Sequence, residues 1–301
     1  MSYEDKFQTL REIYSFPDSA GVVETWLKSV RFFWATKPVP RAPLLYGSGM
    51  IVIGQGHKIG YLNGSEFRYD KDHYLVSSVP TAIECETHAS RENPILGIFI
   101  DIDTSKLHQL IEKVEQHAPA SVPGERDIYS GIEPVRMDRE MQKVVERLLI
   151  CLKSRLDCDV LGASLVEEIT YRALLGGHGK ALAALTEQET HHARVAQSLA
   201  HIHTHYMNSI SVEDLAREAN MSASSFHRAF KTVTGESPLQ YLKKVRLNKA
   251  RFLIVREGLR VGSAANQVGY ESVSQFSREF KRYFDVAPSA AQSGAYAEMF
   301  R

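Results

Sequence analysis

Two stretches of the chain repeat the same residue types fifty positions apart: SSFHRAFKTVTGESP at 224–238 and SQFSREFKRYFDVAP at 274–288. On a helix, the paired phenylalanines of each copy are four residues apart and would pack inward. Serine, arginine and lysine then remain on the outer face. Arginine can make two hydrogen bonds to the edge of guanine, serine bonds base edges or phosphate, and lysine mainly neutralises phosphate. The repeat therefore predicts two short helices that contact nucleic acid.

The outer faces of these helices supply the candidate DNA contacts, which are Ser224, Ser225, His227, Arg228 and Lys231 in the first copy and Val273, Ser274, Ser277, Arg278 and Lys281 in the second. We expect Arg228 and Arg278 to contact bases, and the two lysines to contact phosphates. A merely solvated helix face would explain one isolated copy about as well. Two copies with arginine and lysine at the same helical places favour a DNA contact.

Each copy follows a shorter helix and a turn, which is the helix-turn-helix plan. The first helices are expected at 212–219 and 261–268, and the expected serine N-caps in this region are Ser211, Ser237 and Ser272. One long helix over 238–256 would join the two units and would be roughly 28 Å long. Successive major grooves on one face of DNA lie about 34 Å apart. The spacing thus predicts that the two repeat helices, which we call the reader helices, lie in adjacent major grooves. It also predicts that either the helices are tilted or the DNA is bent.

The charge distribution agrees with this interpretation. The chain is formally neutral, but residues 190–290 hold 14 Lys+Arg against 8 Asp+Glu, while the rest hold 22 against 28. A basic C-terminal third attracts polyanions, of which nucleic acid is the commonest. The acidic remainder of the chain indicates a second task.

The pattern changes along the chain from strands to helices. Residues 1–30 suggest a helical segment with a break at Pro17, and residues 31–102 consist of short β-rich pieces between turn residues. In TAIECETH (81–88) the alternation places Ile83, Cys85 and Thr87 on one face. Helical periodicity follows in 105–117, 138–155 and 161–177. We therefore expect an α+β protein of two domains, bounded at 1–178 and 191–292, with a linker at 179–190.

Residues 190–290 resemble the C-terminal DNA-binding domain of the AraC/XylS transcriptional regulators. The resemblance rests on LAREANMSASSFHRAFKTVTGESPLQYLKKVRLNKARFLI and VGYESVSQFSREFKRYFDVAP. It implies a sequence-specific regulator with two helix-turn-helix units joined by a long helix, and double-stranded DNA and RNA polymerase as partners. Ala264, where the family usually has a larger aliphatic residue, and SAAQSGAY after Pro288 depart from the family pattern.

The N-terminal half resembles an AraC-type N-terminal domain, from RFFWATKPVPRAPLLYGSGMIVIGQG to NPILGIFIDIDTSKLHQLI. This implies a cupin-like β-barrel with flanking helices that senses a small-molecule effector and forms a homodimer. Aromatic residues of such a barrel are candidate effector contacts, although they more often belong to the core. The candidates are Trp34, Tyr46, Tyr61, Tyr69 and Tyr74.

Other functions have weaker support. His201 and His205 share a helical face, as two metal ligands would, but no carboxylate or cysteine clusters with them in sequence. A cupin-type metalloenzyme needs a closely spaced histidine set, which His57, His73 and His88 do not provide. GxSxG and Walker-type loops are absent. We expect no enzyme activity, cofactor or metal. An architectural DNA-binding protein without a ligand is the alternative. Such a protein would have no use for the large acidic N-terminal part.

The remaining signals concern the compartment. No run of 18 or more apolar residues indicates a membrane helix, and the charged N-terminal residues do not look like a signal peptide. Cys85, Cys151 and Cys158 form no CxxC motif and cannot all pair. We expect free thiols in a reducing, cytoplasmic setting without membrane association.

Overall fold

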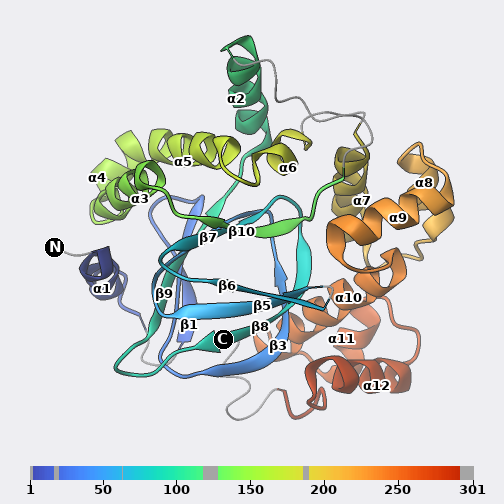
Figure 1. The fold of residues 1–301 in the computed structure, drawn as a ribbon. Helices are drawn as coiled ribbons and strands as arrows, with labels where there is room; N and C mark the ends of the chain where they lie inside the picture. Colours follow the sequence, from blue (N-terminus) through green and yellow to red (C-terminus); the bar gives the residue numbers. More distant parts are fainter. Residues whose placement is uncertain (1–2, 17–19, 63, 118–127, 186–189, 292–301) are drawn as a thin grey trace.

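The computed structural model describes residues 3–16, 20–62, 64–117, 128–185 and 190–291 (Figure 1). Its N-terminal part holds helix α1 (Tyr3–Ile13) and two antiparallel sheets. The helical segment expected over 1–30 is wrong beyond the break, because Ala20–Glu24 pairs as a strand with the residues from Arg31 to Ala35. The six-stranded sheet has the order β1-β2-β9-β4-β7-β10, and the four-stranded sheet has the order β3-β8-β5-β6. The strands are β1 (Ala20–Glu24), β2 (Val30–Ala35), β3 (Val39–Tyr46), β4 (Gly49–Gln55), β5 (His57–Leu62), β6 (Ser65–Tyr69), β7 (His73–Ser77), β8 (Thr81–His88), β9 (Ile95–Asp101) and β10 (Ile132–Arg136).

An apolar core fills the space between the two sheets. Ile51, Ile53 and Leu75 of the larger sheet pack there with Ile83 and Cys85 of the smaller one. The alternation expected in β8 is confirmed, because Ile83, Cys85 and Thr87 are buried while the residues between them are half-buried. The expected barrel consists of two sheets that hydrogen-bond separately among the described strands.

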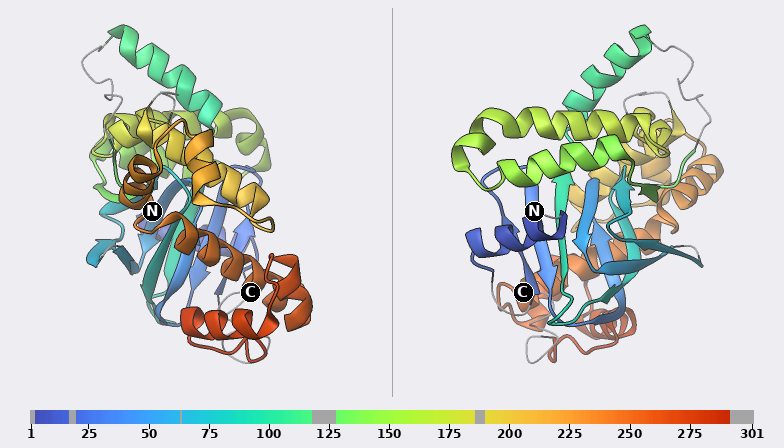
Figure 2. Two further views of the ribbon diagram at one scale, coloured as in Figure 1. Left: turned by 90° about the vertical axis from the view of Figure 1, so that its right-hand side faces the viewer. Right: turned by 60° about the vertical axis from the view of Figure 1, so that its left-hand side comes forward.

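The outer face of the larger sheet is covered by helices (Figure 2). They include α1, α3 (Arg139–Cys151), the single turn α4 (Arg155–Asp157) and α5 (Ala163–Leu175). Helix α2 (Thr104–His117) packs against α5 and α6 (Gly179–Ala183) and extends away from the sheet. Phe32 and Val52 of the sheet meet Leu148 and Ile169 of α3 and α5 in a second core. The helix expected over 138–155 ends at Cys151, because the side chain of Ser154 caps a new turn.

The predicted linker 179–190 is described at both ends. Gly179–Ala183 forms α6, in which Ala181 and Leu182 are buried. Thr190 caps the next helix by accepting a hydrogen bond from the Ala193 amide. Residues 186–189 lie outside the described residues, and the domain boundaries stay a prediction.

The C-terminal part is helical, as expected. Its helices are α7 (His191–His205), α8 (Val212–Glu218), α9 (Ala223–Thr234), α10 (Pro238–Val255), α11 (Val261–Gln267) and α12 (Val273–Phe284). The predicted serine N-caps are confirmed, because Ser211, Ser237 and Ser272 each accept a hydrogen bond from the amide three residues on. Thus α8 with α9, and α11 with α12, form two helix-turn-helix units.

Both units turn through a left-handed residue directly after the C-cap of their first helix. This residue is Asn220 (φ 50°) in the first unit and Gly269 (φ 84°) in the second. Asparagine tolerates this conformation, whereas most other side chains are strained there. Gly269 has a further constraint, since a Cβ atom at this position would lie 2.4 Å from the carbonyl oxygen of Met207. This close approach seats the second unit against the segment that follows α7.

Replacing Gly269 by alanine should therefore destabilise the second unit. Gly258→Ala is the matched control, because Gly258 has a similar φ of 69° but open space around the new methyl group. We expect the control to cost about 1 kcal/mol and Gly269→Ala roughly 2–4 kcal/mol, since strain and clash add. Denaturant unfolding of both variants measures the difference. Equal losses would contradict the close approach to Met207.

Candidate nucleic-acid interface and ligand pocket

Helix α9 separates a buried face from an exposed one. Phe226, Phe230 and Val233 are fully buried against α7, α8 and α10. Ser224, His227, Arg228 and Lys231 are exposed, and Ser225 is half-buried. The side chains of Arg228 and Lys231 make no hydrogen bond or ion pair within the described ranges. They are therefore available to a polyanion.

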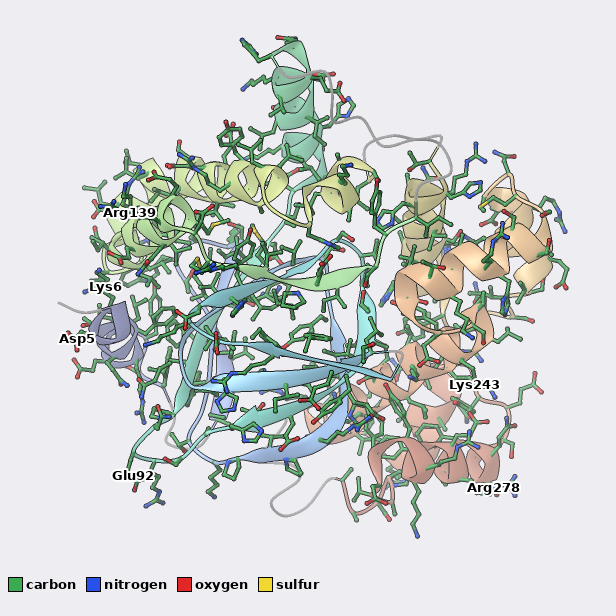
Figure 3. The ribbon with its side chains drawn as sticks, viewed as in Figure 1. Asp5, Lys6, Glu92, Arg139, Lys243 and Arg278 are labelled. Carbon is green, nitrogen blue, oxygen red and sulfur yellow. The ribbon has the colours of Figure 1, made fainter. Side chains whose placement is uncertain are left out.

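Helix α12 repeats this arrangement. Phe276, Phe280 and Phe284 form its buried face. Val273, Ser274, Arg278 and Lys281 are exposed and Ser277 is half-buried. Figure 3 shows Arg278 on the outer side of α12, away from the sheets. The structure thus brings each set of five predicted residues onto one reader helix; contact with DNA stays a prediction.

A carboxylate that the sequence comparison did not single out fixes the position of α12. Glu279 accepts hydrogen bonds from the Tyr270 hydroxyl (2.8 Å), Gln275 (3.2 Å) and the Lys243 ammonium of α10 (3.3 Å). Burial opposes ionisation of Glu279, but these hydrogen bonds outweigh it and hold the pKa of the carboxyl below its ordinary value. The first copy has Ala229 at the corresponding place. This difference between the copies was the available signal.

The hydroxyl of Tyr241 joins the two halves of the protein. It lies on α10 and donates to the carbonyl oxygen of Pro80 at 2.8 Å. Its only proton is used in this bond, so Nε2 of His203, also 2.8 Å away, must donate to the phenol oxygen. Val79 and Ala82, from the loop before β8 and from β8 itself, complete the core around this contact. No sequence signal indicated this contact region between the two halves of the protein, which we call the seam.

Further polar contacts follow the same seam. The Gly131 amide donates to the Val233 carbonyl at the end of α9 (2.8 Å). Ser78 lies between the Gly131 carbonyl (3.2 Å) and Nε2 of His192 (3.4 Å). The Nδ1 atom of His192 is buried and has no hydrogen-bond partner in the part of the chain that the structure describes. The first reader unit is thus bonded to the N-terminal part through backbone and buried side chains.

A pocket of about 390 Å³ opens beside the smaller sheet. Apolar residues of β1, β2, β3 and β9 form most of its wall, with Trp34, Phe33 and Leu44 among them. Three cationic residues also line it: Arg31, Lys58 and Arg256. The last of these is the C-cap of α10, so the DNA-binding part contributes to the wall.

Lys58 lies in an unusual setting within this pocket. Its ammonium is 4.8 Å from the centre of the Phe33 ring and 3.4 Å from the Tyr46 hydroxyl. That hydroxyl is 2.8 Å from the Tyr69 hydroxyl, which in turn is 3.3 Å from Sγ of Cys85. Burial raises the pKa of both tyrosines, so the phenols stay neutral. The chain of contacts holds the lysine in place without giving it a counter-charge.

The predicted aromatic contacts are distributed unequally around the pocket. Trp34 and Tyr46 line it, and Tyr69 is buried behind Tyr46. Tyr61 lies outside its wall, with its hydroxyl on Glu86 and the guanidinium of Arg41 over its ring. Tyr74 packs in the core between the larger sheet and the helices. Whether the lining residues contact an effector stays a prediction.

The histidines of α7 have separate roles. His201 pairs with Glu218 (3.0 Å), and His205 bonds the His201 carbonyl. Among the residues that the structure describes, no three His, Cys, Asp or Glu side chains are placed to hold a metal ion. None of the described helices is long and apolar enough to span a bilayer.

Comparison with known proteins identifies the family. The model of the AraC-type transcriptional regulator N-terminus matches residues 27–181, and a helix-turn-helix domain model matches residues 215–293. The first match alone covers more than half of the chain. The chain belongs to the AraC/XylS family of transcriptional regulators. The two-domain arrangement inferred from the repeat and the strands is that of this family.

Individual relatives in the AraC/XylS family match over shorter lengths. The transcriptional regulator AlkR of Acinetobacter baylyi is 38% identical over 97 residues, which is 32% of this chain and 32% of AlkR. The transcriptional activator RhaS of Klebsiella pneumoniae is 35% identical over 112 residues, 37% of this chain and 40% of RhaS. The chain thus spans less than half the length of these curated relatives.

Solved structures share the fold over most of the chain. ToxT from Vibrio cholerae superposes with a TM-score of 0.53 at 12% identity, covering 87% of this chain and 97% of ToxT. A ToxT structure with a bound unsaturated fatty acid superposes with a TM-score of 0.55 at 12% identity, covering 90% and 95%. The chain therefore shares the two-domain fold of ToxT over most of its described length.

The seam between the two halves should weaken in acid. Burial lowers the pKa of His192 and of His203 to about 4, with smaller effects from His178 and Lys249 respectively. In the unfolded chain the pKa of a histidine has its ordinary value of about 6.5, so the unfolded chain binds these protons at a higher pH than the folded chain does. Stability is therefore full above about pH 6.5 and falls as the pH drops towards about 4, by roughly 1–3 kcal/mol per histidine.

Denaturant unfolding at about pH 7.5 and about pH 5 measures this loss. His203→Gln removes one titrating group while keeping a donor for Tyr241, and should reduce the difference between the two pH values. His227→Gln, on the exposed face of α9, is the control and should leave it unchanged. A His203→Gln variant with the wild-type pH dependence would contradict the assignment.

Proposed function

We propose that this protein is a sequence-specific DNA-binding transcriptional regulator that responds to a small-molecule effector and has no enzyme activity. One observation carries the proposal: two reader helices expose arginine and lysine at matching places, and α10 joins their units. Arg228 and Arg278 contact base edges, while Lys231 and Lys281 contact phosphates. The AraC/XylS relatives, which are named as regulators, support the same assignment.

The effector occupies the pocket beside the smaller sheet in this proposal. A volume of about 390 Å³ is in the range of small-molecule sites. The wall contains Arg256 from the end of α10, so a bound molecule touches both parts of the protein. This arrangement favours a switch over an architectural DNA-binding protein, which would have no use for a pocket. The architectural function is the alternative to be tested.

Two protein partners belong to the proposal. Ile150, Leu156, Val160 and Leu161 are each more than half exposed near the C-terminal end of α3 and the turns that follow it. Clustered exposed apolar side chains often mark an interface, and a second copy of this chain is the proposed occupant. RNA polymerase is the second partner, since RhaS is named an activator.

Variants of α9 separate base reading from phosphate binding. Arg228→Ala should cost about 1–3 kcal/mol of specific binding and relax the preference at one base pair. Lys231→Ala should weaken binding to all sequences alike and reduce the slope of affinity against salt by about one. Gel-shift titrations on operator and random DNA at several salt concentrations measure both. If Arg228→Ala left specific and random binding unchanged, α9 would not be a reader.

Selection from a random duplex library tests the function as a whole. A regulator should enrich two short sequence blocks about one helical turn apart. The operator thus found then serves to screen effectors by gel shift. Salt-sensitive binding without any enriched motif, in the presence and absence of cell metabolites, would overturn the regulator in favour of the architectural alternative.

A further inference from the structure

The pocket wall contains positive charge that the protein leaves unmatched. Lys58 has no carboxylate within ion-pair distance among the described residues; its polar neighbour is the neutral hydroxyl of Tyr46. Arg31 donates through Nη2 to Asp101 at 2.6 Å, but its Nε atom is buried and finds no acceptor within the described ranges. Arg256 is exposed at the rim and makes no side-chain bond that the described part of the chain supplies.

Both features are unfavourable, and a negative group in the pocket would relieve the first of them, the unpaired ammonium of Lys58. A partly desolvated ammonium is stabilised by a paired anion, and a buried N–H without an acceptor loses the hydrogen bond it had in water. The Phe33 and Tyr46 rings offset this only in part through cation–π contacts at 4.8 and 5.9 Å. The wall is thus electrostatically complete only with a negative group near Lys58.

The rest of the wall favours an apolar partner. Trp34, Leu44 and Ile95 belong to a lining that is otherwise mostly hydrophobic. A molecule that fills about 390 Å³ there must bury a hydrocarbon or aromatic body. A highly polar ligand such as a sugar would leave many hydroxyl groups without partners.

We propose that the pocket binds an amphipathic monoanion, such as an apolar carboxylate, whose acidic group lies on Lys58. This rests on the proposed function and names the class of effector. The body of the molecule fills the space towards Trp34 and Leu44, and Arg256 contacts the ligand from the DNA-binding part.

Strand β3 makes such a ligand relevant to DNA binding. Ala42, Leu44 and Leu45 of β3 face the pocket, and the same strand contacts α10 and α12. Arg251 of α10 reaches the Pro43 carbonyl at 3.5 Å, a weak contact at the limit of hydrogen bonding. The first reader unit is held by the Tyr241 seam, so the ligand acts on the position of the second.

Matched pairs of ligands that differ in charge test the binding class. Hexanoate, decanoate, hexadecanoate and naphthoate are each compared with the corresponding alcohol by titration calorimetry on the full chain without DNA. We expect at least one carboxylate to bind roughly tenfold to a hundredfold more tightly than its alcohol, as a charge-assisted hydrogen bond provides. Equal affinity within every pair, or no binding of any carboxylate, would overturn the proposal.

Substitutions then locate the acidic group. Lys58→Met keeps the apolar stem and should abolish the preference for the carboxylate while leaving alcohol affinity unchanged. Because it removes an unpaired charge, it should also unfold at the same or a higher temperature than the wild type. Lys106→Met, on the exposed face of α2, is the control and should keep the preference. A Lys58→Met variant that still prefers the carboxylate would place the acidic group elsewhere.

Arg256→Gln tests the contact from the DNA-binding part. The variant should bind the carboxylate less tightly, and the carboxylate should no longer change its affinity for the operator. Operator binding without ligand should stay as in the wild type. Ligand binding is measured without DNA. A failure of the ligand proposal can therefore be told apart from a failure of the proposed regulator function, which the library selection tests. Wild-type ligand affinity in Arg256→Gln would overturn the contact with α10.

Discussion

Helix α10 belongs to two separate hydrophobic cores, and this sharing fixes the relation of the two reader units. Tyr241, Leu242 and Val245 pack in the core of the first unit. Leu247, Ala250 and Ile254 pack in the core of the second. Each reader helix is only 12 residues long, and a helix of that length is marginal in water without tertiary packing. The readers are therefore stable because α10 and the other helices of each core bury their phenylalanines.

The same helix ties DNA reading to the N-terminal part. Its first half carries Tyr241, whose hydroxyl bonds the Pro80 carbonyl, and its last residues reach the pocket through Arg256. The first unit is joined by an apolar seam and buried hydrogen bonds. The second meets the N-terminal part mainly through β3, with a core of its own. A change in the pocket is thus expected to move the second unit more easily than the first.

Much of the C-terminal fold was predictable because its signals are local. The i, i+4 phenylalanine pairs predicted the buried face of each reader, and Ser237 and Ser272 marked helix starts that their side chains do cap. Asn220 and Gly269 stand at turns that need a left-handed residue. Glu279 was missed because it stands in only one of the two copies. Its three hydrogen bonds, one of them from a lysine 36 positions away, leave little trace in a local pattern.

The sequence by itself determined the helices of the C-terminal part and the β-rich region, which faces of the readers are polar, and to which family the repeat points; it did not determine the strand at Ala20–Glu24, which forms through pairing with a neighbouring strand. Tertiary structure alone decided the seam and the pocket. Tyr241 and Pro80 are 161 residues apart in the chain, and the cations at positions 31, 58 and 256 meet only because β2, β5 and the end of α10 converge. The physical reason is that periodicity and capping depend on neighbours within a turn or two. Burial of a charge or a phenol depends on surfaces that distant segments bring together.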